Sequence, residues 1–501
     1  METRRMLLKA MIAVPFGAAL VMPVLSKPSS IDRLLDVVDN SRTDPNARPP
    51  GVKYVSEPPG ITFLNGGPSG VIRANEGNMG WRRLARGDYA WEHEGEALTP
   101  HGNPIDFGIF MDMPYWDSRN GYGGYGTGGG YPNGVTDSDE TFADGVGTYS
   151  KTSPMVITDS PAKMSLRLKR MALFLGADLP VRITAMQPFM YYGQCLHNLG
   201  AAGIKVQGTM RPEDYPAVPD SSIRKFGIVW PCEMPYREVT AGTGFDEFSS
   251  QFSLLTYSLN SFVSINMANV MNKMGYDTQA HHGAQNYNVL MQTLMIWSGA
   301  AENGLCAFPI TPEIGGRYKN GAVDTNMELA PDEQFLDIGM QAYCQACRKC
   351  YDNCPGSAIT GTNVEVMQPG GPPDNTTPIG TRNYKTWMCD QDKCVHIRGG
   401  PTHGDTNNGT GCDLCIRTCP WSNKPSSWWH DIGEWAVADI PSMNSLLVWI
   451  EDQAKWDLEP IPEDMWWSDI DNAKPAFSQK PSERPIPPTI LPPYIFAPDM
   501  S

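Results

Sequence analysis

The feature that most constrains this 501-residue chain is a pair of cysteine motifs in its C-terminal half. The first motif, Cys-x2-Cys-x2-Cys-x3-Cys-Pro, contains Cys344, Cys347, Cys350 and Cys354. The second, Cys-x2-Cys-x3-Cys-Pro, contains Cys412, Cys415 and Cys419. The first spacing is that of bacterial ferredoxins, in which three thiolates bind one [4Fe–4S] cluster and the fourth binds the other. The sequence therefore predicts two [4Fe–4S] clusters.

This spacing also predicts how the two motifs share their ligands. The first three cysteines should bind one cluster together with Cys419. Cys354 should bind the other with Cys412, Cys415 and one further cysteine, for which Cys389 and Cys394 compete and Cys394 is favoured. Thiolates also suit zinc, but zinc sites rarely repeat a Cys-x3-Cys-Pro step. The remaining cysteines are expected to be buried or incidental, namely Cys195, Cys232 and Cys306.

The composition narrows the class of partner. The formal net charge is -16, and a surface this acidic repels phosphate backbones, so we expect no nucleic acid partner. The chain holds 49 Gly and 44 Pro, which indicates a loop-rich globular protein.

The N-terminus resembles a twin-arginine export signal. Arg4 and Arg5 precede an apolar stretch at residues 11–25, which Pro15 and Pro23 interrupt. The stretch is too short and broken for a membrane span. We expect residues 1–26 to be a signal that exports the folded protein, and a protein whose metal centres are inserted before export suits that route.

Changes in pattern along the chain predict the domain organisation. Helical apolar spacing from Ser160 ends near Gly176, and FGIVW at 226–230 predicts a strand. Residues 252–276 predict a long helix, and residues 289–304 predict a helix that runs into a glycine-rich turn. Because strands and helices alternate there, we expect an α/β domain. The expected divisions are a loop-rich region at 27–159 with a Gly/Tyr-rich loop from Gly121, the α/β domain at 160–331, the cysteine module at 332–424, and a C-terminal helix with a proline-rich tail at 425–501.

Several motifs, taken in order, resemble the corrinoid- and iron–sulfur-dependent reductive dehalogenases. Besides the twin arginines and the cysteine module, they are GAAENG at 299–304, ITPEIGG at 310–316, VDTNMEL at 323–329 and WMCDQDKC at 387–394. The resemblance implies a nitroreductase-like α/β domain that binds a cobalamin-type corrinoid base-off, and a ferredoxin-like α+β module with two [4Fe–4S] clusters. It also implies that Cys394 is the eighth cluster ligand.

The resemblance further implies a function and its partners. Electrons would pass from the clusters to the corrinoid cobalt and remove halogen from a small organohalide. The enzyme would serve organohalide respiration at the outer face of the cytoplasmic membrane, held peripherally by a small membrane-anchor protein and supplied by an electron donor of the respiratory chain.

The proton that replaces the halide needs a weakly acidic donor beside a cation, because positive charge stabilises the phenolate that remains. The resemblance implies that Tyr257 is this donor and that Lys319 is the cation, with Arg317 as the alternative. The competing interpretations are a packed helical tyrosine and a solvent-facing loop lysine.

Two adjacent histidines, His281 and His282, are candidates to face the cofactor or substrate. They do not fit the Asp-x-His-x-x-Gly corrinoid motif, and the resemblance implies that no protein histidine ligates cobalt. The alternative is a solvated helix end.

Two other functions compete. An enzyme resembling epoxyqueuosine reductase would share the corrinoid domain and the clusters, but it should be cytosolic, and an acidic chain suits tRNA poorly. A non-catalytic iron–sulfur electron-transfer subunit would need no α/β domain of this size.

Overall fold

The computed structural model describes residues 51–80, 83, 88, 159–195, 210–219, 221–234, 239, 247–281, 288–332, 335–368, 380–398, 412–422, 428–454, 465 and 468. The predicted export signal and the Gly/Tyr-rich loop lie outside this part of the chain, as does nearly all of the proline-rich tail. Within it, no helix has the length and apolar character needed to cross a membrane.

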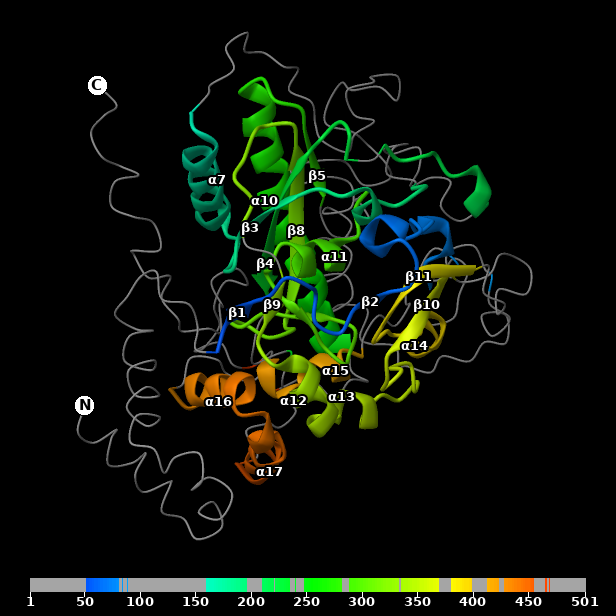
Figure 1. Cartoon of the computed structure of the whole chain (residues 1–501), viewed down its shortest axis with the longest axis vertical. Helices are drawn as coiled ribbons and strands as arrows, with labels where there is room; N and C mark the ends of the chain where they lie inside the picture. The colour runs from blue at the N-terminus through cyan, green and yellow to red at the C-terminus, as the bar shows by residue number, and fades with distance from the viewer. Residues whose placement is uncertain are drawn as a thin grey trace, which may run out of the picture.

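A four-stranded antiparallel sheet lies at the centre of the molecule (Figure 1). Its order is β3 (Arg182–Ala185), β4 (Phe226–Glu233), β8 (Tyr318–Thr325) and β5 (Thr278–His281). β4 and β8 pair along their whole length, with Cys232 opposite Lys319. β4 is buried along nearly its whole length. Its sequence is therefore largely apolar, and this apolar run predicted the strand at 226–230.

Helices cover both faces of this sheet. Successive side chains of β4 point to opposite faces, so Ile228 and Trp230 pack against α7 (Pro161–Leu175) and α10 (Glu247–Lys273). Val229 packs on the other face, against α11 (Met291–Trp297). The predicted α/β mixture is thereby confirmed.

Local capping explains where the two long helices begin and end. Ser160 caps the start of α7, because its hydroxyl accepts the Lys163 N–H, and Gly176 caps the end with φ 118°. α10 is followed by Gly275 with φ 95°, a conformation that glycine adopts without steric cost. Both helices agree with the predicted ones.

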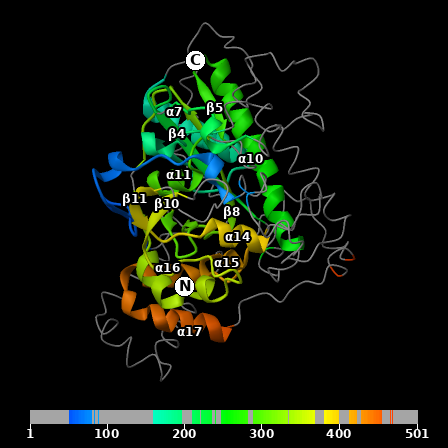
Figure 2. The same ribbon diagram turned by 90° about the vertical axis from the view of Figure 1, so that its right-hand side faces the viewer.

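The cysteine module lies at the end of the molecule away from α7 (Figures 1 and 2). Its helices are α12 (Met340–Cys347), α13 (Lys349–Asp352), α14 (Gln391–Arg398) and α15 (Leu414–Arg417), followed by the 3-10 turn η9 (Pro420–Ser422). α16 (Trp428–Asp439) and α17 (Asn444–Ala454) pack beside α12, and α16 agrees with the predicted C-terminal helix.

Short strands connect the N-terminal segment to the module. β1 (Lys53–Tyr54) pairs with β9 (Leu336–Asp337), and β2 (Thr62–Phe63) pairs with β11 (Gly380–Thr386), which also pairs with β10 (Val364–Gln368). The remaining strands, β6 (Glu302–Asn303) and β7 (Pro309–Ile310), form a hairpin between the central sheet and the module.

Candidate functional site

The structure brings Tyr257 and Lys319 together. Tyr257 lies on α10 and Lys319 on β8, and both residues are half-buried. The Lys319 ammonium nitrogen is 5.4 Å from the centroid of the Tyr257 ring, within the range of a cation–π contact. Lys319 is therefore on a strand of the central sheet and not on a solvent-facing loop, so that competing interpretation is wrong.

A glycine on β8 allows α10 to approach the sheet beside this pair. A Cβ at Gly321 would lie 2.8 Å from Asn260 Oδ1 and 2.8 Å from Trp230 Nε1. Contacts this short do not occur for real Cβ atoms, so a larger residue here would force the side chains of Asn260 and Trp230 to shift.

Buried polar atoms without a partner lie beside Gly321, two residues after Lys319. In the described part of the chain, both amide atoms of Asn260 and Trp230 Nε1 are buried and have no hydrogen-bond partner. Each such atom costs about 1–3 kcal/mol unless a ligand satisfies it. The amide groups at the edge of a corrinoid both donate and accept, so this set of donors and acceptors suits a corrinoid.

Arg317, the alternative cation, is engaged elsewhere. It is fully buried, and its Nη2 lies 2.8 Å from Glu233 Oε1. Its Nη1 donates to the Met234 carbonyl at 2.7 Å, and its Nε donates to the Ser422 carbonyl at 3.1 Å. Arg317 thus joins β4 to the turn after the second cysteine motif, which leaves Lys319 as the better candidate cation.

His281 belongs to a buried polar network. It lies on β5, so the alternative of a solvated helix end is wrong for it. Its Nε2 is 3.1 Å from Asp324 Oδ1, and Tyr191 donates to the other carboxylate oxygen at 2.9 Å. Burial opposes ionisation of Asp324, but His281 and Arg224 outweigh it and lower the pKa of the carboxyl. A contact of His281 with the corrinoid stays a prediction, and His282 lies outside the described residues.

The two cysteine motifs fold into equivalent turns. Arg348 follows Cys347 with φ 53°, and Asp413 follows Cys412 with φ 46°. In each turn the carbonyl of this left-handed residue accepts two N–H groups of the short helix that begins there. Because few residues other than glycine adopt positive φ, the same rare conformation at matching positions indicates a shared constraint on the thiols.

Most of the motif cysteines pack against one shared core of the module, and their division into two ligand sets stays a prediction. Burial raises the pKa of Cys344 and of Cys419, and nearby thiols of the first set contribute to both shifts. In the second set Cys389 and Cys394 share a hydrogen bond, and Cys354 and Cys415 lie near them. The Cys354 sulfur also accepts the Ala358 N–H at 3.2 Å. The choice between Cys389 and Cys394 as eighth ligand stays a prediction.

The donor set of the module consists of thiols. Over the described ranges, no three His, Cys, Asp or Glu side chains converge as they would on one metal ion. A [4Fe–4S] cluster binds one thiolate at each iron. The two motifs supply the ligand chemistry that such clusters need, and their binding stays a prediction.

The helix before the sequence motif GAAENG runs into a glycine turn, as predicted, and Gly299 has φ 69°. α11 ends at Trp297, and Glu302 and Asn303 form β6. Glu302 Oε2 accepts the N–H groups of Ile338 and Met340 at 2.8 and 3.2 Å, and Oε1 accepts that of Gln341 at 3.2 Å. Burial raises the pKa of Glu302 to about 7, although these hydrogen bonds oppose the shift.

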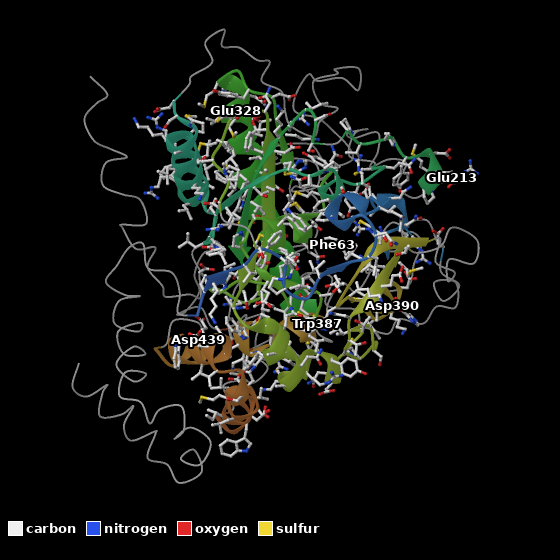
Figure 3. All side chains as sticks on the ribbon, viewed as in Figure 1. Phe63, Glu213, Glu328, Trp387, Asp390 and Asp439 are labelled. Carbon is white, nitrogen blue, oxygen red and sulfur yellow. The ribbon has the colours of Figure 1, made fainter. Side chains whose placement is uncertain are left out.

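Glu302 thus caps α12, the helix that carries Cys344 and Cys347. Its neighbour Asn303 bonds to β11, where Nδ2 donates to Thr386 Oγ1 at 2.8 Å. Trp387, the next residue, packs in the core that the hairpin and the module share (Figure 3). Sequence reasoning missed this role of Glu302, although an acidic residue within an otherwise apolar motif was a signal for it.

Comparisons with known proteins agree with these features. No family model matches the chain. The chain is 29% identical over 183 residues to a tetrachloroethene reductive dehalogenase of Desulfitobacterium hafniense, and this match covers 36% of the chain and 30% of that protein. It is 28% identical over 168 residues to the tetrachloroethene reductive dehalogenase of Sulfurospirillum multivorans, and this match covers 33% of the chain and 30% of that protein. The matches thus span less than a third of these relatives.

A solved catabolic reductive dehalogenase has the same fold. The superposition covers 81% of this chain and 49% of the solved chain, with a TM-score of 0.57 and 18% sequence identity. The same protein was also solved in complex with 3-bromo-4-hydroxybenzoic acid. An epoxyqueuosine reductase of Atelocyanobacterium thalassa matches over only 118 residues, at 30% identity.

The sequence matches and the shared fold make this chain similar to reductive dehalogenases, in agreement with the resemblance that its motifs indicated.

Proposed function

We propose that this chain is the catalytic subunit of a reductive dehalogenase that replaces a halogen on a small organohalide by hydrogen. The contact between Tyr257 and Lys319 carries the proposal, because it pairs a proton donor with a cation beside buried polar atoms without partners. Two electrons and a proton convert the carbon–halogen bond into a carbon–hydrogen bond and a halide ion.

The cofactors would be held by two parts of the chain. The nitroreductase-like α/β domain would bind the corrinoid base-off, with Asn260 and Trp230 as candidate partners for its edge. The ferredoxin-like module would hold two [4Fe–4S] clusters, one at Cys344, Cys347, Cys350 and Cys419, the other at Cys354, Cys394, Cys412 and Cys415. When bound, the clusters supply electrons one at a time and the corrinoid supplies a two-electron reductant at cobalt.

The protein's own part in the chemistry is the transfer of a proton. Tyr257 holds a proton on its phenol oxygen and would deliver it to the carbon that loses the halide. The positive charge of Lys319, near the ring, stabilises the phenolate that results. Gly321 keeps α10 close to β8, and so keeps the two groups together.

The N-terminal sequence supports export, and the resemblance to the family supports the partners. The twin-arginine pair supports export of the folded protein to the outer face of the cytoplasmic membrane, where a small membrane-anchor protein would hold it and a donor of the respiratory chain would reduce it. The net charge of -16 disfavours nucleic acid, and with it a tRNA substrate such as an enzyme resembling epoxyqueuosine reductase would use. A non-catalytic electron-transfer subunit would not need an α/β domain of this size.

Metal analysis of the whole chain tests the proposal. After anaerobic reconstitution with iron, sulfide and cobalamin, we expect about eight iron atoms and about one cobalt per chain. Corrinoid absorption bands should stay with the protein through gel filtration. Iron without cobalt would overturn the dehalogenase assignment and favour an electron carrier.

A further inference from the structure

Arg83 is a buried cation that bonds to the helix carrying a predicted cluster ligand. Only 1% of its side chain is exposed, and its Nη1 donates to the Asp392 carboxylate on α14. The same helix carries Cys394, the favoured candidate for the eighth ligand. Successive residues of an α-helix are about 100° apart, so Asp392 and Cys394 leave α14 about 200° apart. Arg83 therefore holds the face of α14 that is turned away from Cys394.

Two glycines allow the backbone to approach different faces of the same helix. A Cβ at Gly80 would lie 2.8 Å from Val395 Cγ2, and the Gly80 N–H donates to Gln391 Oε1 at 3.0 Å. A Cβ at Gly356, which follows the first cysteine motif, would lie 2.8 Å from Ile397 Cγ1. α14 is therefore packed closely between the segment that leads to Arg83 and the loop after the first motif.

Backbone hydrogen bonds connect Cys394 to Cys354, which the motif spacing assigns to the same cluster. The Ala358 N–H donates to the Cys354 sulfur at 3.2 Å, and the Ala358 carbonyl accepts the Asp390 N–H at 2.7 Å. The Asp390 carbonyl in turn accepts the Cys394 N–H at 3.0 Å. A shift of α14 would therefore change the spacing of these two thiols.

The segment that carries Arg83 is also bound to the α/β domain. The Glu76 N–H donates to the Gln194 carbonyl at 3.0 Å, and the Tyr192 hydroxyl donates to the Met79 sulfur at 3.0 Å. The Arg83 N–H donates to the Met79 carbonyl at 3.0 Å, so Arg83 lies one helical turn further along the segment. Arg83 thus joins α14 to a part of the chain outside the cysteine module.

We propose that Arg83 positions Cys394 as a ligand of the second cluster, to which the motif spacing also assigns Cys354 and Cys412. This role rests on the proposed function, because it needs the clusters, and it extends their support to the N-terminal segment. Arg83 acts through Asp392 and α14, so it is a positioning residue and not a catalytic one.

The first cluster has a separate support. Glu302 bonds to the start of α12, the helix that carries Cys344 and Cys347. This bond involves neither α14 nor the segment of Arg83. Removal of Arg83 should therefore loosen the second cluster and leave the first one in place.

Anaerobic release of iron to the chelator bathophenanthroline disulfonate, measured on the reconstituted full chain, tests this role. In Arg83→Met, about four iron atoms per chain should leave several-fold faster than in the wild type, while the other four leave at the wild-type rate. Arg83→Lys keeps a cation and should restore slow release. Cys412→Ala, which lacks a ligand of the second cluster, identifies the electron paramagnetic resonance signal of that cluster.

Two further variants separate this role from a general loss of stability. Asp392→Ala removes the other partner, whose side chain is 35% exposed, and should speed release of the same cluster even if Arg83→Met fails to fold. Arg224→Met is the matched control, since Arg224 is 16% exposed and pairs with Asp277 at 3.0 Å in the α/β domain. It should release both clusters at wild-type rates.

Selective loss of the second cluster from Arg83→Met or Asp392→Ala is the expected result. Wild-type release from Asp392→Ala and from folded Arg83→Met would overturn the role of Arg83. Equal acceleration for both clusters would also overturn it, because it would indicate a general loosening of the fold. Absence of clusters from the wild type would instead refute the proposed function.

Discussion

The Lys319 ammonium nitrogen lies 5.4 Å from the centre of the Tyr257 ring, across the contact between α10 and β8. This relationship joins two residues that are 62 positions apart (319 − 257) on different elements. Gly321, two residues after Lys319, makes the contact possible, because any side chain there would meet Asn260 and Trp230. The proposed proton donor and its cation thus depend on close packing of a helix on a sheet.

Tyr257→Phe should abolish most turnover without loss of cofactors. The substitution removes only the phenol oxygen, and loss of a general acid costs about 10²–10⁴-fold in rate. Tyr276→Phe is the matched control, since Tyr276 follows the C-terminal end of α10 and packs in the core. Dehalogenation rates and metal contents of both variants check the prediction. Wild-type rates in Tyr257→Phe would remove Tyr257 from the mechanism.

The eighth cluster ligand can be assigned by paired substitutions. Cys394→Ala should lose about four iron atoms per chain, because the second cluster loses a ligand. Cys389→Ala should keep both clusters, although the two thiols are hydrogen-bonded to one another. Iron analysis and electron paramagnetic resonance distinguish the variants. The reverse pattern would make Cys389 the ligand.

Arg317→Met should destabilise the fold. The ion pair between Arg317 and Glu233 is fully buried, and loss of one partner of such a pair costs about 3–5 kcal/mol. Glu233→Gln in the same chain should recover part of the loss, because the unpaired charge disappears. Arg211→Met is the matched control, since its side chain is 66% exposed and its ion pair should contribute little. Thermal unfolding measures all three variants. Equal melting temperatures for Arg317→Met and Arg211→Met would contradict this account of Arg317.

Glu302 should make stability depend on pH. Burial raises its pKa from 4.5 to about 7, and the charge of Asp337 adds to the shift. The folded state therefore binds more protons than the unfolded state between these values, and its free energy of unfolding falls as pH rises through this window. The shift corresponds to about 3 kcal/mol.

Glu302→Gln removes this titration, so its melting temperature should fall less than that of the wild type between about pH 5 and pH 7. Melting curves of the reconstituted proteins at several pH values provide the measurement. Parallel profiles for the two proteins would show that Glu302 does not titrate in this range.

Much of the fold could be predicted because the signals were local. Ser160 and Gly176 mark the two ends of α7 because they cap it. The apolar run of β4 reflects a strand that is buried on both faces. The cysteine spacing likewise indicated two sets of thiols. The pairing of Tyr257 with Lys319 came from the resemblance to the family, since no local pattern joins α10 to β8.

The rest depended on contacts between distant segments. Residues 302–303, predicted only as part of a glycine-rich turn, form a strand because they pair with β7, and Glu302 bonds to the start of α12. His281 lies in a strand because it pairs with Ala322 on β8. Cys306, expected to be buried or incidental, is buried beside the motif cysteines because the hairpin packs on the module. Sequence periodicity carries no signal for such pairings.

The central claim is tested most directly by halide release from the reconstituted chain. The assay supplies reduced methyl viologen and a panel of chlorinated alkanes, alkenes and phenols under anaerobic conditions, with free cobalamin and Tyr257→Phe as controls. We predict that at least one compound yields halide and dehalogenated product in equal amounts, far faster than with either control. A chain that holds iron and cobalt but releases no more halide than free cobalamin would contradict the account.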